Sequence, residues 1–302
     1  ASIGGDTGGS IRNPAAFCGV TGLKPTWGRV SRYGSLALVW SQDCAGPLAR
    51  SAEDCALLLQ ALAGYDPHDP WTSRDPVPDY SATLGQGVRG LRIGVVRELM
   101  EGETDREVRR AVAAALGVLK GEGAIVEEVS LPLVPLAGYI YAGVADSEAA
   151  SLHRDVLRRR LYDLDYSTRV RLLVGSVLPA QLATLAQRGR TAVREEMSRA
   201  LERFHLLAGP TSATAAPRIE AASAVSGKED AARRVYGPGR AYTTVANLYG
   251  GPAISVPCGF TAEQLPIGLQ LLGRHFDEAT VLRAAHAYQQ RTDWHLRRPP
   301  VS

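Results

Sequence analysis

A predicted strand, helix and second strand that follow one another along the chain constrain the fold most strongly. The apolar run Leu91–Val96 has the length of a buried strand, and Ala124–Val129 has the same pattern. Between them, Thr104 and Glu107 stand at the spacing of a capping box that would begin a helix. That helix would bury one apolar stripe, formed by Val108, Val112, Leu116 and Leu119. A strand, a helix and a strand in this order favour a parallel βαβ unit and therefore the α/β fold class.

The rest of the chain adds predicted helices and strands around this unit. A helix is expected from Ser51, which can cap its first amides, to Gly64, which can close it. Residues 134–204 are predicted to be mostly helical, whereas 205–211 has the pattern of a buried strand. Two apolar runs within 251–273 flank a polar loop and predict neighbouring strands, and a final helix follows them. This order of elements predicts a mixed central β-sheet covered by helices on both faces.

The composition excludes several classes of protein. The 34 basic and 31 acidic residues nearly cancel, so no nucleic-acid-binding face is expected. The four cysteines are scattered without a C-x-x-C pair, which argues against a structural zinc or a disulfide framework and favours a reducing compartment. No apolar run reaches the roughly 18 residues that a membrane span needs, and the start lacks the pattern of a signal peptide. The sequence therefore predicts a cytoplasmic protein without a membrane segment.

The stretch "GGDTGGSIRNP" near the start of the chain is the candidate for chemistry. Ser10 follows Gly8 and Gly9 and precedes a short predicted helix, Ile11–Cys18, which Gly19 can end. Amides at a helix start have no helical partner, so they can bind an oxyanion beside the serine hydroxyl. Two other readings fit these residues: a glycine turn in which Ser10 caps the helix, and a phosphate loop, although no phosphate-loop motif is present. None of the six histidines has a sequence context that marks it as a base.

Two long segments of the chain resemble the amidase signature family. The first runs from "GGDTGGSIRNPAAFCGVTGLKPT" to "AGYDPHDP", and the second from "YTTVANLYGGPAISVPCGF" to "DWHLRRP". Together they cover a little under half of the chain, and the predicted elements between them follow a compatible order. The resemblance implies the amidase signature fold, with residues 1–302 as the C-terminal portion of a single amidase signature domain.

The resemblance also implies a role for each residue of the opening stretch. The family hydrolyses or transfers amides through a serine acyl-enzyme, and Ser10 would be the acylated nucleophile. The oxyanion hole would be formed by the backbone amides of Thr7, Gly8, Gly9 and Ser10. Asp6 and Arg12 would orient the turn, although an ion pair that serves only the fold is an equally good interpretation of these two residues. The family chemistry uses a small-molecule amide as substrate and requires no metal and no cofactor, so none is expected.

The chain departs from the family pattern at its start. In the family, a bridging serine held in a cis peptide and a catalytic lysine both lie upstream of the nucleophile, and neither is found in this sequence. The chain is therefore expected to be N-terminally truncated and inactive alone, because a serine hydroxyl is a weak nucleophile without a neighbouring base. Lys24, in "GLKPT", matches a different family position and is expected to be structural.

The predicted function is hydrolysis of a carboxylic amide, with three alternatives. The chain could be the A subunit of a glutamyl-tRNA amidotransferase, a truncated pseudoenzyme or a nucleotide-binding module. The central segment "ADSEAASLHRDVLRRRLYDLDYSTRVRLLVG" resembles general amidases more than that amidotransferase component, which favours a stand-alone amidase. Tyr139, Tyr141 and Trp40 would border an apolar pocket or, more often, pack in the core. A homodimer stays open, since relatives commonly form one.

Overall fold

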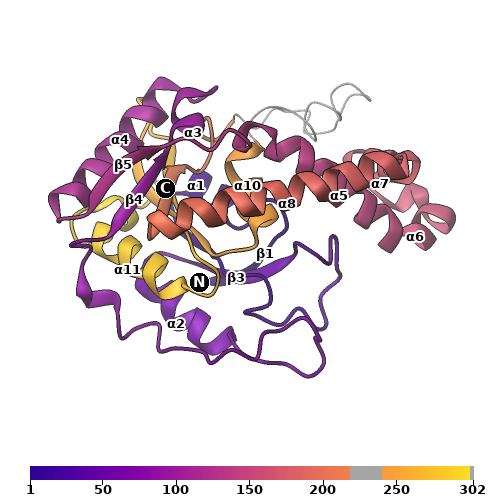
Figure 1. Ribbon diagram of the computed structural model, residues 1–302, viewed down its shortest axis with the longest axis horizontal. Helices are drawn as coiled ribbons and strands as arrows, with labels where there is room; N and C mark the ends of the chain where they lie inside the picture. Colours follow the sequence, from indigo (N-terminus) through magenta and orange to yellow (C-terminus); the bar gives the residue numbers. More distant parts are fainter. Residues whose placement is uncertain (218–239, 300–302) are drawn as a thin grey trace.

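The computed structural model describes residues 1–217 and 240–299 and contains a mixed β-sheet with helices on both faces (Figure 1). The strands are β1 (Ser2–Asp6), β2 (Thr21–Lys24), β3 (Cys44–Ala49), β4 (Arg92–Val96), β5 (Ile125–Val129), β6 (Leu206–Pro210), β7 (Ala253–Phe260) and β8 (Pro266–Gly273). Their order in the described sheet is β1-β3-β2-β7-β8-β6-β4-β5. Strand β4 pairs in parallel with β5 and with β6, whereas the other pairs are antiparallel. The predicted fold class is confirmed.

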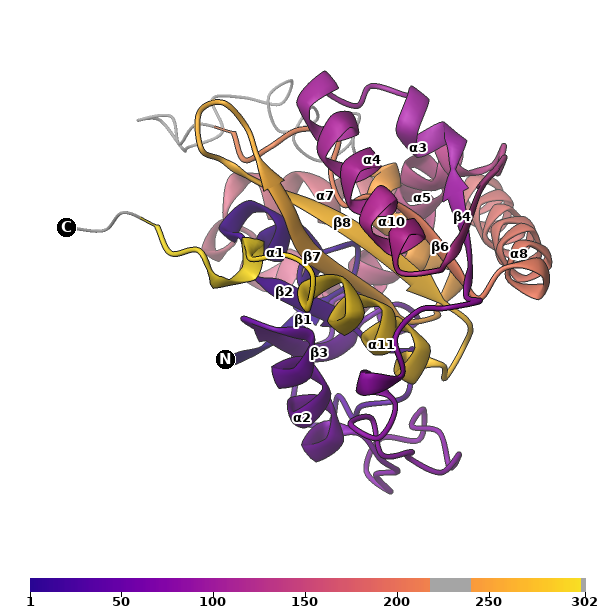
Figure 2. The same ribbon diagram turned by 90° about the vertical axis from the view of Figure 1, so that its left-hand side faces the viewer.

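Two hydrophobic cores lie on opposite faces of this sheet. The helices are α1 (Arg12–Cys18), α2 (Ala52–Leu62), α3 (Arg97–Glu101), α4 (Arg106–Gly121), α5 (Ala137–Leu152), α6 (Arg154–Arg159), α7 (Tyr166–Val177), α8 (Ala180–Arg203), α10 (Ala241–Tyr249) and α11 (Glu278–Gln289). Helices α2, α4 and α11 share the first core with β7 and β8, while α5, α8 and α10 share the second. Figure 2 shows β7 and β8 crossing the centre of the molecule, with α11 packed alongside them.

The βαβ unit forms where the sequence predicts it. Strands β4 and β5 are parallel neighbours, and α4 between them buries the predicted stripe against the sheet. The predicted capping box is wrong, because α4 begins at Arg106 without a side-chain cap. The Thr104 hydroxyl instead donates to the Leu99 carbonyl over 2.6 Å, and the Glu107 carboxylate accepts the Ala262 amide over 2.8 Å. Both side chains therefore serve tertiary contacts rather than the helix start.

Ser51 caps the start of α2 as predicted, and with Asp54 it forms a capping box that the sequence analysis did not identify. The Ser51 hydroxyl accepts the Asp54 amide over 3.0 Å, and the Asp54 carboxylate accepts the Ser51 amide over 3.2 Å. Two first-turn amides thus gain acceptors that the helix cannot supply. The helix ends at Leu62 with Ala63 as its extended C-cap, and the Gly64 amide donates to the Arg29 carbonyl, so Gly64 marks the end of the segment without closing the helix itself.

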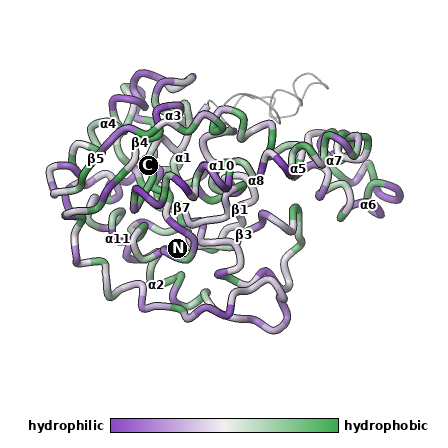
Figure 3. The backbone as a smooth tube through the Cα atoms, viewed as in Figure 1, coloured by the Kyte–Doolittle hydropathy of each residue, from purple (hydrophilic) through white to green (hydrophobic). Residues whose placement is uncertain are grey.

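Helices α5, α6, α7 and part of α8 project from the body of the molecule as an arm (Figure 1). Hydrophobic residues occur along this arm as well as in the body (Figure 3). In the described ranges, no helix on its own has the length and apolar composition of a membrane span, and one pair, α7 with α8, meets those two criteria together across a bend of 102°.

Candidate active site

The turn that carries Ser10 joins the end of β1 to the start of α1. Gly9 in this turn has φ +124°, a backbone conformation that favours glycine, and a Cβ there would collide with the Thr243 hydroxyl. A Cβ on Gly8 would come within 2.7 Å of the Tyr141 hydroxyl. Both glycines therefore let the turn pack closely against α5 and α10. Gly19, with φ +64°, ends α1 in the left-handed conformation that the sequence predicts.

The carboxylate of Asp6 fixes the shape of the turn from inside. It accepts the Gly9 amide over 2.8 Å and the Ile11 amide over 3.2 Å, and it has no exposed surface. The side-chain amide of Asn247, on α10, donates to the same carboxylate over 2.8 Å. Asp6 thus bonds two backbone amides of the turn and links that turn to α10.

The guanidinium of Arg12 extends this network across the second core. It donates to both oxygens of Asp6, over 2.9 and 3.0 Å, and is itself fully buried. Its other hydrogen bonds reach the Thr243 carbonyl, the Asn247 side chain and the Gln270 side chain on β8. Burial alone would raise the pKa of Asp6, but the Arg12 charge and these hydrogen bonds lower it to about 2. Asp6 is therefore ionised at neutral pH.

The Ser10 hydroxyl opens into a cavity of about 480 Å³. The described residues that line it are Thr7, Gly8, Gly9, Ser10, Asn13, Pro14, Phe17, Cys18, Leu38, Tyr141, Arg171 and Arg240. Ser10 is exposed, and no described residue lies within hydrogen-bond distance of its hydroxyl. The hydroxyl is therefore accessible to a molecule in the cavity.

The backbone amides around Ser10 are not equivalent. Of the four amides expected to form an oxyanion hole, that of Gly9 already donates to Asp6 over 2.8 Å. Among the described residues, the amides of Thr7, Gly8 and Ser10 have no acceptor within hydrogen-bond distance. These three amides lie beside the serine hydroxyl and can donate to a negatively charged oxygen.

The side chain of Thr7 connects the turn to the loop before β3. Its hydroxyl donates to Asp43 over 2.6 Å. The other oxygen of Asp43 accepts the amides of Leu38 and Val39 over 2.8 and 2.9 Å. Since Leu38 lines the cavity, this chain of contacts sets the position of one wall relative to Ser10.

Two arginines that the sequence did not single out line the same cavity as Ser10. Arg171, on α7, forms an ion pair with Asp146 on α5, with nitrogen–oxygen distances of 2.7 and 3.0 Å. Arg240 precedes α10, and its guanidinium carbon lies 5.7 Å from the centre of the Tyr141 ring. Burial raises the pKa of the Tyr141 hydroxyl, so this ring is neutral at ordinary pH. The cavity therefore has an apolar ring and two cations among its lining groups.

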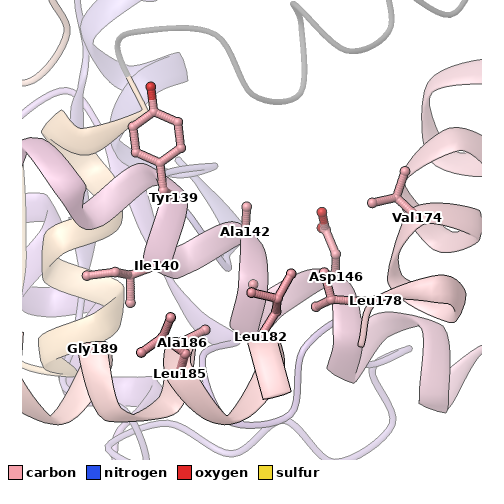
Figure 4. A pocket seen from close by; sticks show the side chains of 11 residues that line it. Tyr139, Ile140, Ala142, Asp146, Val174, Leu178, Leu182, Leu185, Ala186 and Gly189 are labelled. Atoms are coloured by element: carbon pink, nitrogen blue, oxygen red, sulfur yellow. The ribbon is translucent and has the colours of Figure 1, made fainter. Parts of the chain in front are cut away.

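The other residues considered in the sequence lie elsewhere. Tyr139 borders a separate apolar hollow of about 480 Å³, and Figure 4 shows its lining from α5, α7 and α8. Trp40 lines a third, more polar hollow near Asp43. Lys24 has no exposed surface, and its ammonium donates to the Pro25 carbonyl over 2.8 Å. It does not line the Ser10 cavity.

Comparison with known proteins shows to which family this chain belongs. The profile of the family described as Amidase matches residues 1–282. The chain belongs to the amidase family. The A subunit of the glutamyl-tRNA(Gln) amidotransferase from Roseiflexus sp. strain RS-1 is 44% identical over 100% of this chain and 65% of its own length. The chain thus spans about 65% of the length of the curated amidase-family relatives that it matches.

Solved amidase-family structures have the same fold. The A subunit of the Thermotoga maritima glutamyl-tRNA(Gln) amidotransferase superposes with a TM-score of 0.81 at 32% identity, over 96% of this chain and 62% of that one. A peptide amidase from Stenotrophomonas maltophilia gives 0.77 at 33% identity, over 99% and 63%. Both an amidotransferase subunit and a peptide amidase are therefore among its relatives.

The described part of this amidase-family chain holds no group of three or more His, Cys, Asp or Glu side chains that could bind a metal ion. The cysteines there are unpaired, with Cys18 exposed at the cavity and Cys44, Cys55 and Cys258 buried.

Proposed function

We propose that this chain contributes the nucleophile of an amide hydrolase and that Ser10 is that nucleophile. In the first step, the Ser10 Oγ bonds to the amide carbonyl carbon, the C–N bond breaks, and the hydroxyl proton leaves on the nitrogen of ammonia or an amine. In the second step, water attacks the ester carbon, releases the carboxylic acid and returns a proton to Ser10 Oγ. The negative charge that develops on the carbonyl oxygen is stabilised by the amides of Thr7, Gly8 and Ser10.

One observation carries this proposal: an accessible serine hydroxyl lies beside backbone amides without acceptors, on a turn that Asp6 and Arg12 hold rigidly. Preorganised donors of this kind stabilise a developing oxyanion without reorganising during the reaction. We propose that Gly9 belongs to the same site, because its backbone conformation sets the direction of the neighbouring amides. Asp6 and Arg12 act through the turn and do not reach into the cavity lining.

We further propose that residues 1–302 belong to a single amidase signature domain. The strands near the start of the chain, β1 to β3, hydrogen-bond in the same sheet as β7 and β8 near its end. Arg12 also joins the first helix to α10 and β8. A boundary between two independently folded units would cut through these bonds.

The test is ammonia release from primary amides by the protein made from its complete gene. Ser10→Ala is expected to lower the rate by roughly 10³-fold or more, with an unchanged unfolding temperature because the hydroxyl has no described partner. Ser2→Ala is the matched control, since Ser2 is also exposed but lies on β1 away from the cavity lining. Activity that survives Ser10→Ala would refute the nucleophile assignment.

A second candidate is the A subunit of a glutamyl-tRNA amidotransferase, which the 44% identity to the Roseiflexus protein favours. In that case glutamine would be the amide donor, and ammonia release would depend on partner proteins. Comparing glutamine with simple amides, with and without added partner proteins, separates the two candidates. Release from simple amides by the protein alone supports the stand-alone amidase.

A further inference from the structure

The charge of the Ser10 cavity indicates what kind of amide it accepts. Two of the described lining residues, Arg171 and Arg240, are cationic, and none of the described lining residues is acidic. Tyr141, Leu38 and Phe17 add apolar surface to the same lining. A ligand that reaches Ser10 therefore meets apolar groups and two guanidinium groups in the same space.

The two arginines differ in how their charge is balanced. Arg171 bonds to the buried carboxylate of Asp146 through two nitrogens, so much of its charge is already compensated. For Arg240, no carboxylate in residues 1–217 or 240–299 lies within ion-pair distance. Its guanidinium lies near the Tyr141 ring and hydrogen-bonds to the Tyr141 hydroxyl, and a neutral hydroxyl does not cancel the guanidinium charge.

Burial makes the charge of Arg240 costly for the protein on its own. Removal from water lowers the pKa of Arg240 and the neighbouring charge of Arg171 lowers it further, while Tyr141 and Asp146 offset these effects only in part. An anion placed between these groups would offset both effects, because a planar guanidinium binds a carboxylate through two parallel hydrogen bonds. A ligand ammonium would add a third positive charge to the same cavity.

We propose that Arg240 selects an amide whose acyl chain carries a carboxylate and no ammonium group, that is, a monoamide of a dicarboxylic acid. The amide end lies at Ser10 and the carboxylate end lies at Arg240 and Arg171. This inference rests on the proposed function, and it names the substrate class of that same site. It disfavours glutamine, which carries the carboxylate together with an ammonium group on the adjacent carbon.

Three ligands of nearly equal size test the proposal by binding alone. Glutaramate has the amide and the carboxylate, valeramide has the amide without the carboxylate, and L-glutamine adds an ammonium to glutaramate. Calorimetry on the Ser10→Ala protein measures their affinities without turnover. Glutaramate is expected to bind about tenfold or more tightly than either of the other two.

Arg240→Gln should remove this preference, so that glutaramate and valeramide bind within about threefold of each other. Arg188→Gln is the matched control, because Arg188 is exposed on α8 and does not line the cavity. Equal binding of all three ligands, or an unchanged preference in Arg240→Gln, would overturn the inference. If glutaramate is preferred but Ser10→Ala does not reduce ammonia release, the substrate class stands as a binding preference and the nucleophile assignment falls.

Discussion

The carboxylate of Asp6 and the guanidinium of Arg12 form a fully buried ion pair behind the turn that carries Ser10. Every hydrogen bond of this pair goes to backbone or side-chain groups of the turn, α10 or β8. The pair therefore connects α1 with α10 and with β8. Its integrity determines both how firmly the turn is held and where its amides point.

Arg12→Gln is predicted to destabilise the protein strongly, because the substitution leaves the Asp6 charge buried without its cation. We expect the free energy of unfolding to fall by about 3–5 kcal/mol, measured by denaturant titration. Arg160→Gln serves as the comparison, since Arg160 pairs with Asp163 at the surface and should change stability by less than about 1 kcal/mol. Similar losses in the two variants would show that the buried pair does not hold the turn.

Stability should fall in acid through the Asp6 carboxylate. Its pKa of about 2 in the folded protein lies below the ordinary value of 3.8, so the unfolded chain binds more protons between these values. The resulting stabilisation, about 2 kcal/mol, is fully present above the unfolded pKa and is lost as the pH falls through the folded one. Unfolding measured at several pH values from about 5 to about 2 should show a shallower decline in Asp6→Asn than in the natural protein.

Gly9→Ala is predicted to damage the turn, whereas Gly5→Ala is tolerated. Alanine at Gly9 must adopt φ +124° and collides with Thr243, which we expect to cost about 1–3 kcal/mol and most of the activity. A Cβ at Gly5 has no atom within 4 Å. Unfolding temperature and ammonia release check both variants, and the idea fails if the two glycines tolerate alanine equally well.

Thr7→Val is expected to loosen the cavity wall, because it keeps the shape of threonine but removes the hydrogen bond to Asp43. The loss of a bond to a charged acceptor should lower stability by about 1.5 kcal/mol. It should also raise the KM for amides, since Leu38 is positioned through Asp43. Thr7→Ser retains the hydroxyl and should behave like the natural protein; equal effects of both substitutions would assign the role to the methyl group instead.

Sequence patterns predicted those parts of the fold that depend on residues close together along the chain. Helix α2 is bounded by signals at Ser51 and Gly64, and the βαβ unit follows from the periodicity of its own residues. Strand β1 was not predicted, because "SIGGD" is rich in glycine and mostly exposed. It becomes a strand by pairing with β3, a partner far along the chain, and no property of the segment itself indicates that pairing.

The sequence likewise predicted only one part of the candidate site. The turn around Ser10 is encoded in consecutive residues, so its glycines and its serine stand out in the sequence. Arg171 and Arg240 come to the cavity from α7 and from the residue before α10, and neither has a distinctive context. The capping box assigned to Thr104 failed for a related reason, since that hydroxyl donates to the Leu99 carbonyl and is also hydrogen-bonded to the Tyr242 hydroxyl in the folded protein.

The reach of the Arg12 side chain has a consequence for synthesis on the ribosome. Its partners Thr243, Asn247 and Gln270 follow it by 231, 235 and 258 residues. At about 5–20 residues per second, a nascent chain waits roughly 10–50 s between making the turn and making its anchors. Throughout that interval Arg12 has Asp6 but none of these three later partners, so the growing polypeptide carries Ser10 before it carries an active site.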